Sequence, residues 1–290
     1  MSLDLTGISN FNEYYSNHYF ATEFATTAKD TLDYWRKQQQ ETPAWRTPWA
    51  RLREVAQRFY VLYAQAQRLR VSEQRLEVIR ELADLYLYAL DYPAQEPRLK
   101  QVHETLQVPV YREIIKANGA PLLWVVLADE SSENDESDIF EGHAFAGYVE
   151  ASAAQSSTPL PHQDQLPMEA LISKVFFSVD PPRWLLVIGL QQIALVDRNK
   201  WNEKRYIRFE LEDIFARREE STLQAVAVLL HRSSLCPAEG TSLLDTLGEE
   251  SFKHATAVSQ DLKYALRECV ELLGNEASTT CKTATTPAPP

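Results

Sequence analysis

The sequence predicts an α+β protein with a helical N-terminal bundle, a small mixed β-sheet and a helical C-terminal connector. Three observations predict this order. Apolar residues recur at helical spacing in the first hundred residues, short apolar runs of strand length follow them, and the longest amphipathic pattern lies near the end. We therefore expect a helical region at 1–107, a small α/β domain at 108–220, a helical connector at 221–276 and a disordered tail at 277–290.

Composition places the chain among ordinary folded proteins. Its 290 residues are 44% hydrophobic and 24% charged, which excludes a mostly disordered or collagen-like chain. No apolar run of about 18 residues occurs, so no membrane span is expected. Three widely spaced cysteines favour reduced thiols in the cytoplasm over a disulfide framework. The net charge of −12 argues against coating nucleic acid by bulk electrostatics but leaves a local basic face open.

Three amphipathic helices are expected in the N-terminal segment, at 24–36, 51–70 and 72–90. Each has apolar residues at helical spacing on one side and charged residues on the other, which is typical of helices that pack on one another. Ser72 is positioned to cap the third helix. Pro93 ends it, because proline cannot continue the hydrogen-bond ladder.

Strand-like segments begin near residue 108. Residues 108–111 look extended, and the apolar run 121–128 suits a buried strand. Two further apolar runs, 183–190 and 192–198, flank a short turn and predict a β-hairpin. The alternating segment 206–211 predicts one more strand.

Further helices are expected among and after these strands. One is predicted at 166–177, with a proline in its first turn, and another at 221–231. The longest is predicted at 249–273, where Gly274 supplies a C-terminal stop. The tail 277–290 is rich in Thr, Ala and Pro without an apolar period, so disorder is expected there.

Asp129 and Glu130 are the candidate metal ligands. They follow a predicted buried strand, and carboxylates at strand ends hold Mg²⁺ in phosphodiesterases. The alternative is a solvated acidic loop, since residues 129–142 hold seven acidic residues and no basic one. No convincing second carboxylate with a lysine at nuclease spacing is found, so a nuclease site would be degenerate. Zinc-site spacings and the GxSxG motif of hydrolases are also absent from the sequence.

A basic run after the predicted hairpin is the candidate nucleic-acid contact. Its cations alternate with Asn, Trp and Tyr, a mixture that suits phosphate contact combined with base stacking. The alternative is a charged turn whose Trp and Tyr pack inward. The cations are Arg198, Lys200, Lys204, Arg205 and Arg208.

Several blocks of the sequence resemble a known family. They are PRWLLVIGLQQIALVDRNKWNEKRYIRFELEDIFARRE, LLHRSSL, EESFKHATAVSQDLKYALRECVELLGNE, the opening ISNFNEYYSNHYF and the segment PLLWVVLADES. Together they are similar to the N-terminal region of large bacterial adenine-specific DNA methylases. Those proteins are type IIG-like restriction–modification proteins of phage-defence islands. The resemblance is patchy in the middle and covers roughly residues 8–276.

The resemblance implies a defence protein that modifies and can cut DNA. It implies a degenerate restriction-nuclease-like sheet and a helical connector that leads into the methylase. The family's cofactors are S-adenosylmethionine and Mg²⁺, and its partners are DNA, the methylase domain and other defence-system subunits. Here the methylase motif Asn/Asp-Pro-Pro-Tyr/Phe is absent, since Asp180-Pro181-Pro182 continues to Arg183, and no Gly-rich loop occurs.

The expectation from this comparison is a truncated or frameshifted N-terminal fragment that contacts DNA, binds no cofactor of its own and is inactive alone. The helix at 249–273 is expected to present an apolar stripe that packs on the missing methylase. Two alternatives stay open. One is a non-catalytic docking protein of a larger assembly, and the other is an active Mg²⁺-dependent DNA nuclease.

Overall fold

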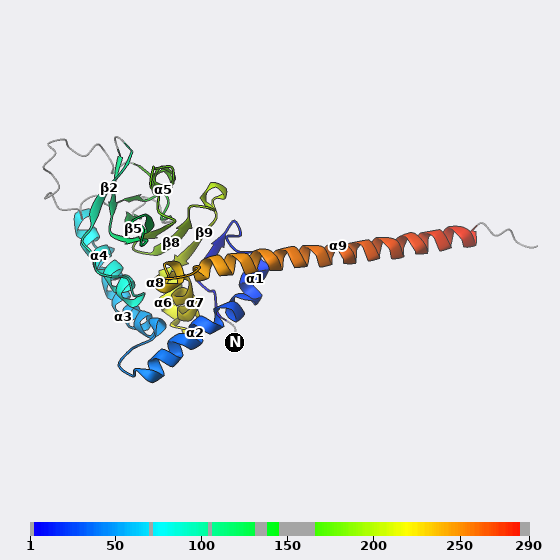
Figure 1. Cartoon of the computed structure of the whole chain (residues 1–290), viewed down its shortest axis with the longest axis horizontal. Helices are drawn as coiled ribbons and strands as arrows, with labels where there is room; N and C mark the ends of the chain where they lie inside the picture. Colours follow the sequence, from blue (N-terminus) through cyan, green and yellow to red (C-terminus); the bar gives the residue numbers. More distant parts are fainter. Residues whose placement is uncertain (1–2, 70–71, 104–105, 131–137, 145–165, 285–290) are drawn as a thin grey trace, which may run out of the picture.

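A mixed β-sheet runs through the centre of the computed structural model, which describes residues 3–69, 72–103, 106–130, 138–144 and 166–284 (Figure 1). Within these residues seven strands form the sheet in the order β1-β9-β8-β7-β5-β4, with β6 paired to β5. The strands are β1 Ile8–Phe11, β4 Arg112–Ile115, β5 Pro121–Asp129, β6 His143–Ala144, β7 Trp184–Ile188, β8 Gln192–Asp197 and β9 Tyr206–Glu210. A separate hairpin pairs β2, Arg98–His103, with β3, Leu106–Val110.

The predicted strands and hairpin are confirmed. β7 and β8 pair antiparallel across the turn at residues 189–191, and β8 pairs antiparallel with β9. β5 and β7 are parallel neighbours, and helix α5, Met168–Phe176, lies on the connection between them. β5 and β7 are apolar along nearly their whole length because both of their faces are covered.

Each face of the sheet supports its own hydrophobic core. Alternate strand residues point to opposite faces. Leu123, Val125 and Leu127 of β5 belong to a core that the larger group of helices covers. Trp124 and Val126 belong to a second core, covered by α5 and the β2–β3 hairpin. The helices of the first face are α1 Asn17–Thr22, α2 Phe24–Glu41, α3 Pro48–Ala66, α4 Ser72–Ala89, α6 Leu211–Arg217, α7 Glu220–Leu230 and α8 Arg232–Leu235.

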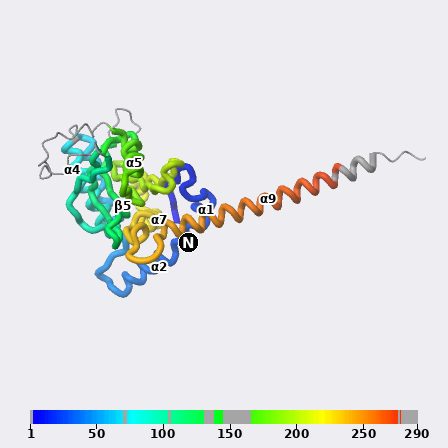
Figure 2. Tube along the Cα trace, turned by 45° about the horizontal axis from the view of Figure 1, so that its top comes forward, coloured from blue at the N-terminus to red at the C-terminus, as the bar shows by residue number. Residues whose placement is uncertain are grey.

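The last helix, α9, Leu243–Ala284, leaves the body of the molecule (Figures 1 and 2). Leu244, Leu247 and Ser251 of its first turns are buried. From Ser259 to Asn275 every side chain is exposed. At about 1.5 Å per residue its 42 residues make a rod of about 63 Å.

The expected end of this helix is wrong. Gly274 was predicted to stop it, and 277–290 to be disordered, but α9 continues through Gly274 to Ala284. Glycines in a left-handed conformation end helices readily, and Gly274 is not among the described glycines with positive φ. A right-handed glycine inside a helix costs only about 1 kcal/mol, which the helix formers around it outweigh. Residues 285–290, and residues 131–137 of the acidic loop, lie outside the described residues.

The sheet is larger than the predicted one, and the helices begin and end differently. β1, β2, β4 and β6 were not expected, and β1 and β2 lie in the segment 1–107 that was predicted to be helical. β1 is short and pairs with β9 about two hundred residues later, so no local pattern marks it. The second helix begins at Pro48 rather than at residue 51, because proline is well accommodated in the first turn.

The segments 1–107, 108–220 and 221–276 contribute to one core. Phe59 of α3 contacts the ring of Phe215 of α6, with ring centroids 5.2 Å apart. α7 is buried on all sides, which fits its apolar composition around the whole helix. The expected boundaries therefore do not separate independent cores. Among the described helices, none combines the length and apolar character needed to cross a bilayer.

Candidate functional site

The base of α9 is fixed to the body by charged and capping contacts. Ser242 Oγ accepts a hydrogen bond from the Asp245 amide (3.0 Å) and donates to the Asp245 carboxylate (2.8 Å), which satisfies an amide at the helix start. Arg183, just before β7, binds Asp197 through two nitrogens (2.8 and 3.0 Å) and Asp245 through a third contact (2.8 Å). Asp197 is almost fully buried, so this network ties α9 to the sheet.

Two buried tyrosines support the same helix start. The Tyr15 hydroxyl donates to the Leu244 carbonyl (3.1 Å), and Lys200 Nζ donates to the Tyr14 carbonyl (2.7 Å). The Lys200 ammonium also lies 3.8 Å from the centroid of the Tyr14 ring. Burial lowers the pKa of Lys200 to about 8, with Arg205 and Arg183 acting in the same direction against Asp197. Arg183, Tyr15 and Ser242 hold the start of α9 to the body, and we call them, together with Lys200, the α9 anchor.

Helix α1 and the residue before it also contact the first turns of α9. The Ser16 amide donates to Ser251 Oγ (2.7 Å), and the rings of His18 and His254 stack with centroids 5.0 Å apart. Beyond this point α9 has no further support from the body, since its described side chains after Val258 are all exposed. The described part of α9 is therefore an arm that contacts the body at one end.

One side of this arm is apolar, and we call it the α9 stripe. Leu262, Leu266 and Leu273 are 57%, 62% and 67% exposed, values that leave most of each side chain in water. The apolar positions recur every three or four residues and continue the helix face that Leu244 and Leu247 bury against the body. The α9 stripe consists of Ala255, Val258, Leu262, Ala265, Leu266, Cys269, Leu272 and Leu273. A contiguous exposed apolar surface of this kind marks an interaction site.

The cations of the basic run all have partners inside the chain. Arg198 donates to the Pro181 carbonyl (2.9 Å), in addition to the anchor contact of Lys200. The other three form ion pairs at 2.7 Å: Lys204 with Glu169, Arg205 with Glu203, and Arg208 with Glu210. Lys204 and Arg205 keep 44% and 40% of their side chains exposed, whereas Arg208 keeps 19%.

The aromatic residues of the run face inward, as the alternative interpretation expected. Trp201 is buried and its indole N–H donates to Ser173 Oγ (2.9 Å) on α5. The ring of Tyr206 stacks on Phe11 of β1, with centroids 4.5 Å apart. Rings that are packed in this way do not offer a face for base stacking.

Asp129 and Glu130 do not form a metal site together. Asp129 Oδ2 is 2.8 Å from the Arg75 guanidinium on α4. Glu130 is buried, and its two oxygens accept hydrogen bonds from the amides of Gln191 (2.8 Å) and Gln192 (3.0 Å) in the β7–β8 turn. These oxygens face N–H donors rather than an open position, so the pair does not fit Mg²⁺. Within the described residues no cluster of three or more His, Cys, Asp or Glu is arranged to hold a metal ion.

Glu130 instead locks the segment after β5 onto the β7–β8 turn. Burial raises the pKa of Glu130 to about 8, against the two amide hydrogen bonds, which favour the charged form. Gly189 packs directly on this carboxyl group. A Cβ at position 189 would lie 1.9 Å from Glu130 Oε1, so any larger residue there would have to displace the Glu130 carboxyl group.

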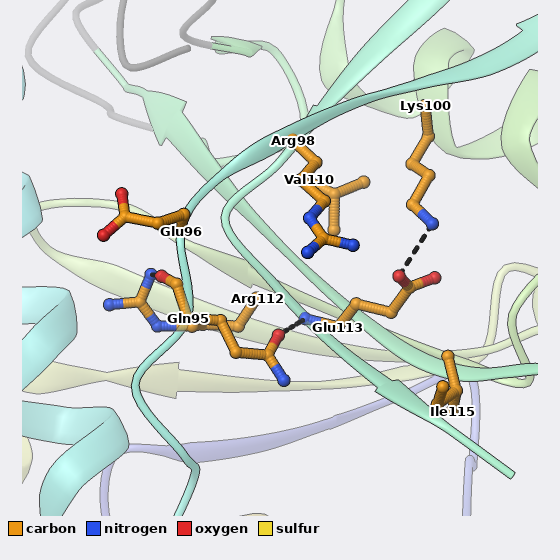
Figure 3. A pocket seen from close by; sticks show the side chains of 8 residues that line it. All are labelled: Gln95, Glu96, Arg98, Lys100, Val110, Arg112, Glu113 and Ile115. Carbon is orange, nitrogen blue, oxygen red and sulfur yellow. Dashed lines mark hydrogen bonds and ion pairs between the residues drawn. The ribbon is translucent and has the colours of Figure 1, made fainter. Parts of the chain in front are cut away.

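A recess of about 190 Å³ lies beside β2, β3 and β4 (Figure 3). Three of its five charged lining residues are in ion pairs: Lys100 Nζ lies 2.7 Å from Glu113, and Arg112 lies 2.6 Å from Asp84 of α4. The Glu113 amide donates to the Gln95 side chain (3.0 Å). These contacts engage the side chains of Lys100, Arg112, Glu113 and Gln95 with other groups of the chain. It is lined by Gln95, Glu96, Arg98, Lys100, Val110, Arg112, Glu113 and Ile115.

The chain matches no protein-family model, no curated protein and no solved structure. The α9 stripe is the surface feature that points most directly to a function. Its apolar spacing is visible in the sequence, but its exposure depends on where the body ends and α9 continues alone.

Proposed function

We propose that this chain is a non-catalytic docking module, which joins a larger assembly through α9. The observation that supports it is the α9 stripe, a row of exposed apolar side chains on a helix whose base is held by Arg183, Tyr15 and Ser242. A surface helix normally turns its apolar stripe toward a partner. A fixed base holds the stripe in one orientation, which lowers the entropy lost when a partner binds.

The contacts of the two candidate chemical sites support the same proposal. The carboxylates of Asp129 and Glu130 bind Arg75 and two backbone amides, and the basic run is engaged in ion pairs and in the α9 anchor. Lys204 and Arg205 are the most exposed of the three cations in ion pairs. In this proposal they are the residues that would meet a DNA phosphate if the assembly brings DNA to this face.

The sequence resemblance supports a DNA-modifying assembly of the restriction–modification kind as the setting. In that setting the body is a degenerate nuclease-like domain, and a methylase partner supplies the S-adenosylmethionine site and the adenine chemistry. The proposal places the module in the cytoplasm, where reduced cysteines and DNA are both found.

A pair of matched substitutions on α9 tests the docking function. Leu262→Glu puts a charge in the α9 stripe, and Tyr264→Glu puts the same charge on the opposite side of the helix, where Tyr264 is 71% exposed. In extracts of cells that produce the chain at its native level, we expect the unmodified chain to migrate in gel filtration as part of a larger complex. Leu262→Glu should release it from that complex, and Tyr264→Glu should not.

Migration of the unmodified chain as a free monomer in these extracts would contradict the proposal. So would a complex that survives Leu262→Glu. Thermal unfolding of both purified variants serves as the folding control, because position 262 is exposed and its substitution leaves the body intact.

A further inference from the structure

We propose that the recess beside β2, β3 and β4 binds a small organic acid, a molecule with one carboxylate and a short apolar part. This site goes beyond the docking function, because β2 and the projecting part of α9 lie on different sides of the body (Figure 1). Its basis is an unpaired guanidinium, an excess of hydrogen-bond donors and an apolar wall, all of which line the same recess.

Arg98 provides the group that binds the carboxylate. It lies directly opposite Val110 in the β2–β3 hairpin, and its side chain extends from β2 toward β4 (Figure 3). Among the described residues its guanidinium has no hydrogen-bond or ion-pair partner. A guanidinium presents its N–H groups in a planar fork that matches the two oxygens of a carboxylate.

Two neighbouring side chains that line the recess also have unused donors. Lys100 lies two positions after Arg98, on the same face of β2, and its ammonium has three N–H groups, of which Glu113 takes one at 2.7 Å. The Gln95 side chain accepts from the Glu113 amide through its oxygen (3.0 Å). Its NH₂ group has no partner within the part of the chain that the structure describes.

The carboxylates of the recess do not supply acceptors for these donors. Glu113 is only 15% exposed, and its two oxygens already accept from Lys100 and from the Trp124 indole N–H (2.9 Å). The Glu96 side chain points away from Arg98 (Figure 3). The ligand that suits this recess therefore brings acceptor oxygens of its own.

The charge of the lining favours one negative charge on the ligand over two. Three cationic and two anionic side chains line the recess, which gives a net charge of +1. A carboxylate balances this charge. A phosphate group carries up to about two negative charges near neutral pH, and the second would meet the Glu113 carboxylate, which Trp124 holds in place.

Val110 and Ile115 give the recess an apolar wall. Val110 is buried and Ile115 is 57% exposed, so a ligand that covers Ile115 removes apolar surface from water. The volume of about 190 Å³ is below the roughly 300–1,000 Å³ of sites for drug-sized molecules. A short branched acid fits these dimensions better than a nucleotide does.

Titration of the full chain with 3-methylbutanoate at pH 7 and constant ionic strength tests the site. The indole N–H signal of Trp124 in a proton–nitrogen correlation spectrum is the reporter, because its acceptor Glu113 is also the partner of Lys100. We expect a saturable shift of this signal with a Kd of about 1–10 mM. Arg98→Gln should weaken binding about tenfold, and Arg68→Gln, at an exposed position outside the recess, should not.

Absence of a saturable shift up to about 50 mM overturns the proposal, and so does binding that Arg98→Gln leaves intact. Thermal unfolding of both arginine variants is the folding control, since both positions are exposed. Inorganic phosphate, titrated in the same way, should bind more weakly than 3-methylbutanoate. Equal or tighter binding of phosphate overturns the assignment to a carboxylate.

A second variant tests the apolar wall. Ile115→Ser should weaken the binding of 3-methylbutanoate about threefold or more, and should leave the binding of acetate, which lacks the branched tail, unchanged. If acetate binds the unmodified chain as tightly as 3-methylbutanoate does, the apolar part of the proposal is wrong.

A free acid and the C-terminus of a protein chain present the same carboxylate. N-acetylvaline distinguishes these two sources, because it has the carboxylate and branched side chain of 3-methylbutanoate together with the amide group of a chain. Tighter binding of N-acetylvaline assigns the recess to a protein C-terminus, and weaker binding assigns it to a free acid. Either result supports a carboxylate site.

Discussion

Glu130 is a carboxylic acid placed where water does not reach it. Its position at the end of a buried strand suggested a metal ligand, but both oxygens bind the backbone of the β7–β8 turn. The nearby Glu210 and Asp129 add to the effect of burial and hold the pKa of Glu130 high, at about 8. Glu130 therefore makes the free energy of unfolding depend on pH.

The sign follows from the two pKa values. The ordinary pKa of the glutamate carboxyl is 4.5, and in the folded protein it is about 8. The folded state therefore holds its proton more tightly, and the free energy of unfolding falls as the pH rises from about 5 to about 8. Glu130→Gln removes this titration. We expect the stability difference between the wild type and Glu130→Gln to shift by about 2–4 kcal/mol in favour of the variant between pH 5 and pH 8.

Urea unfolding at pH 5 and pH 8 measures this difference. At pH 5 the variant should be the less stable protein. Its side-chain amide has only one oxygen to accept the two hydrogen bonds from Gln191 and Gln192, so one turn amide faces an NH₂ group and loses its acceptor. Glu41→Gln, at an exposed position, is the matched control and should show no such shift. Equal pH dependence in wild type and Glu130→Gln would show that Glu130 is not the group responsible.

Single residues of the candidate sites could be found in the sequence, but their partners could not. Lys204 and Lys200 were named as cations for DNA, yet their partners Glu169 and the Tyr14 carbonyl come from α5 and from the chain's first segment. A basic run has the same appearance in sequence whether phosphates or the chain's own carboxylates neutralise it. Only the fold decides between them.

Long elements with a clear period were predictable, and short ones were not. α2 and the β7–β8 hairpin follow directly from apolar spacing. β1 has four residues and α6 has seven, and both depend on distant neighbours: β1 on its pairing with β9, and α6 on the core beneath Phe215. Tertiary packing therefore overrode weak local preference in these elements.

Gly274 gives a direct test of how α9 continues. In the structure it is an interior helix residue, and a Cβ added there meets nothing within 4 Å. Gly274→Ala should therefore stabilise the outer helix by about 1 kcal/mol, since alanine loses less backbone freedom in a helix. Hydrogen exchange of the amides around residue 274 should slow in the variant.

The opposite outcome would be equally informative. A helix that ended at Gly274 in a left-handed conformation would be disrupted by alanine, and exchange of the preceding amides would become faster. Ala265→Gly, at an exposed position nearer the body, is the reciprocal control and should speed exchange along the outer helix.

The molecule as a whole divides into a body with two cores and an outer helix with none. The first core takes residues from all three predicted segments, including Phe59, Val125 and Leu229. No fragment limited to one predicted segment retains this core. The described side chains of α9 from Ser259 to Asn275 are exposed and add no burial to it.

Removing the outer helix should therefore leave the body's stability nearly unchanged. A chain that ends after Val258 keeps the Ser251 and His254 contacts with α1. At low protein concentration its thermal midpoint should lie within about 3 °C of the full chain's. A fragment of residues 108–220 should show no cooperative transition in the same calorimetric scan, because it lacks β1 and the helices α1–α4, α7 and α8 of the first face. Cooperative unfolding of that fragment would show that residues 108–220 fold as an independent domain, and would contradict this prediction.

The contacts of Arg183 also determine the direction in which α9 points. The part of α9 beyond Phe252 is about 50 Å long, so a tilt of about 10° at its base would move its tip by about 9 Å. The two hydrogen-bonded carboxylates at Arg183 thus set the direction of a lever. Whatever is attached along that lever stands at a defined distance and angle from the body, a separation that a flexible tether of equal length would not hold.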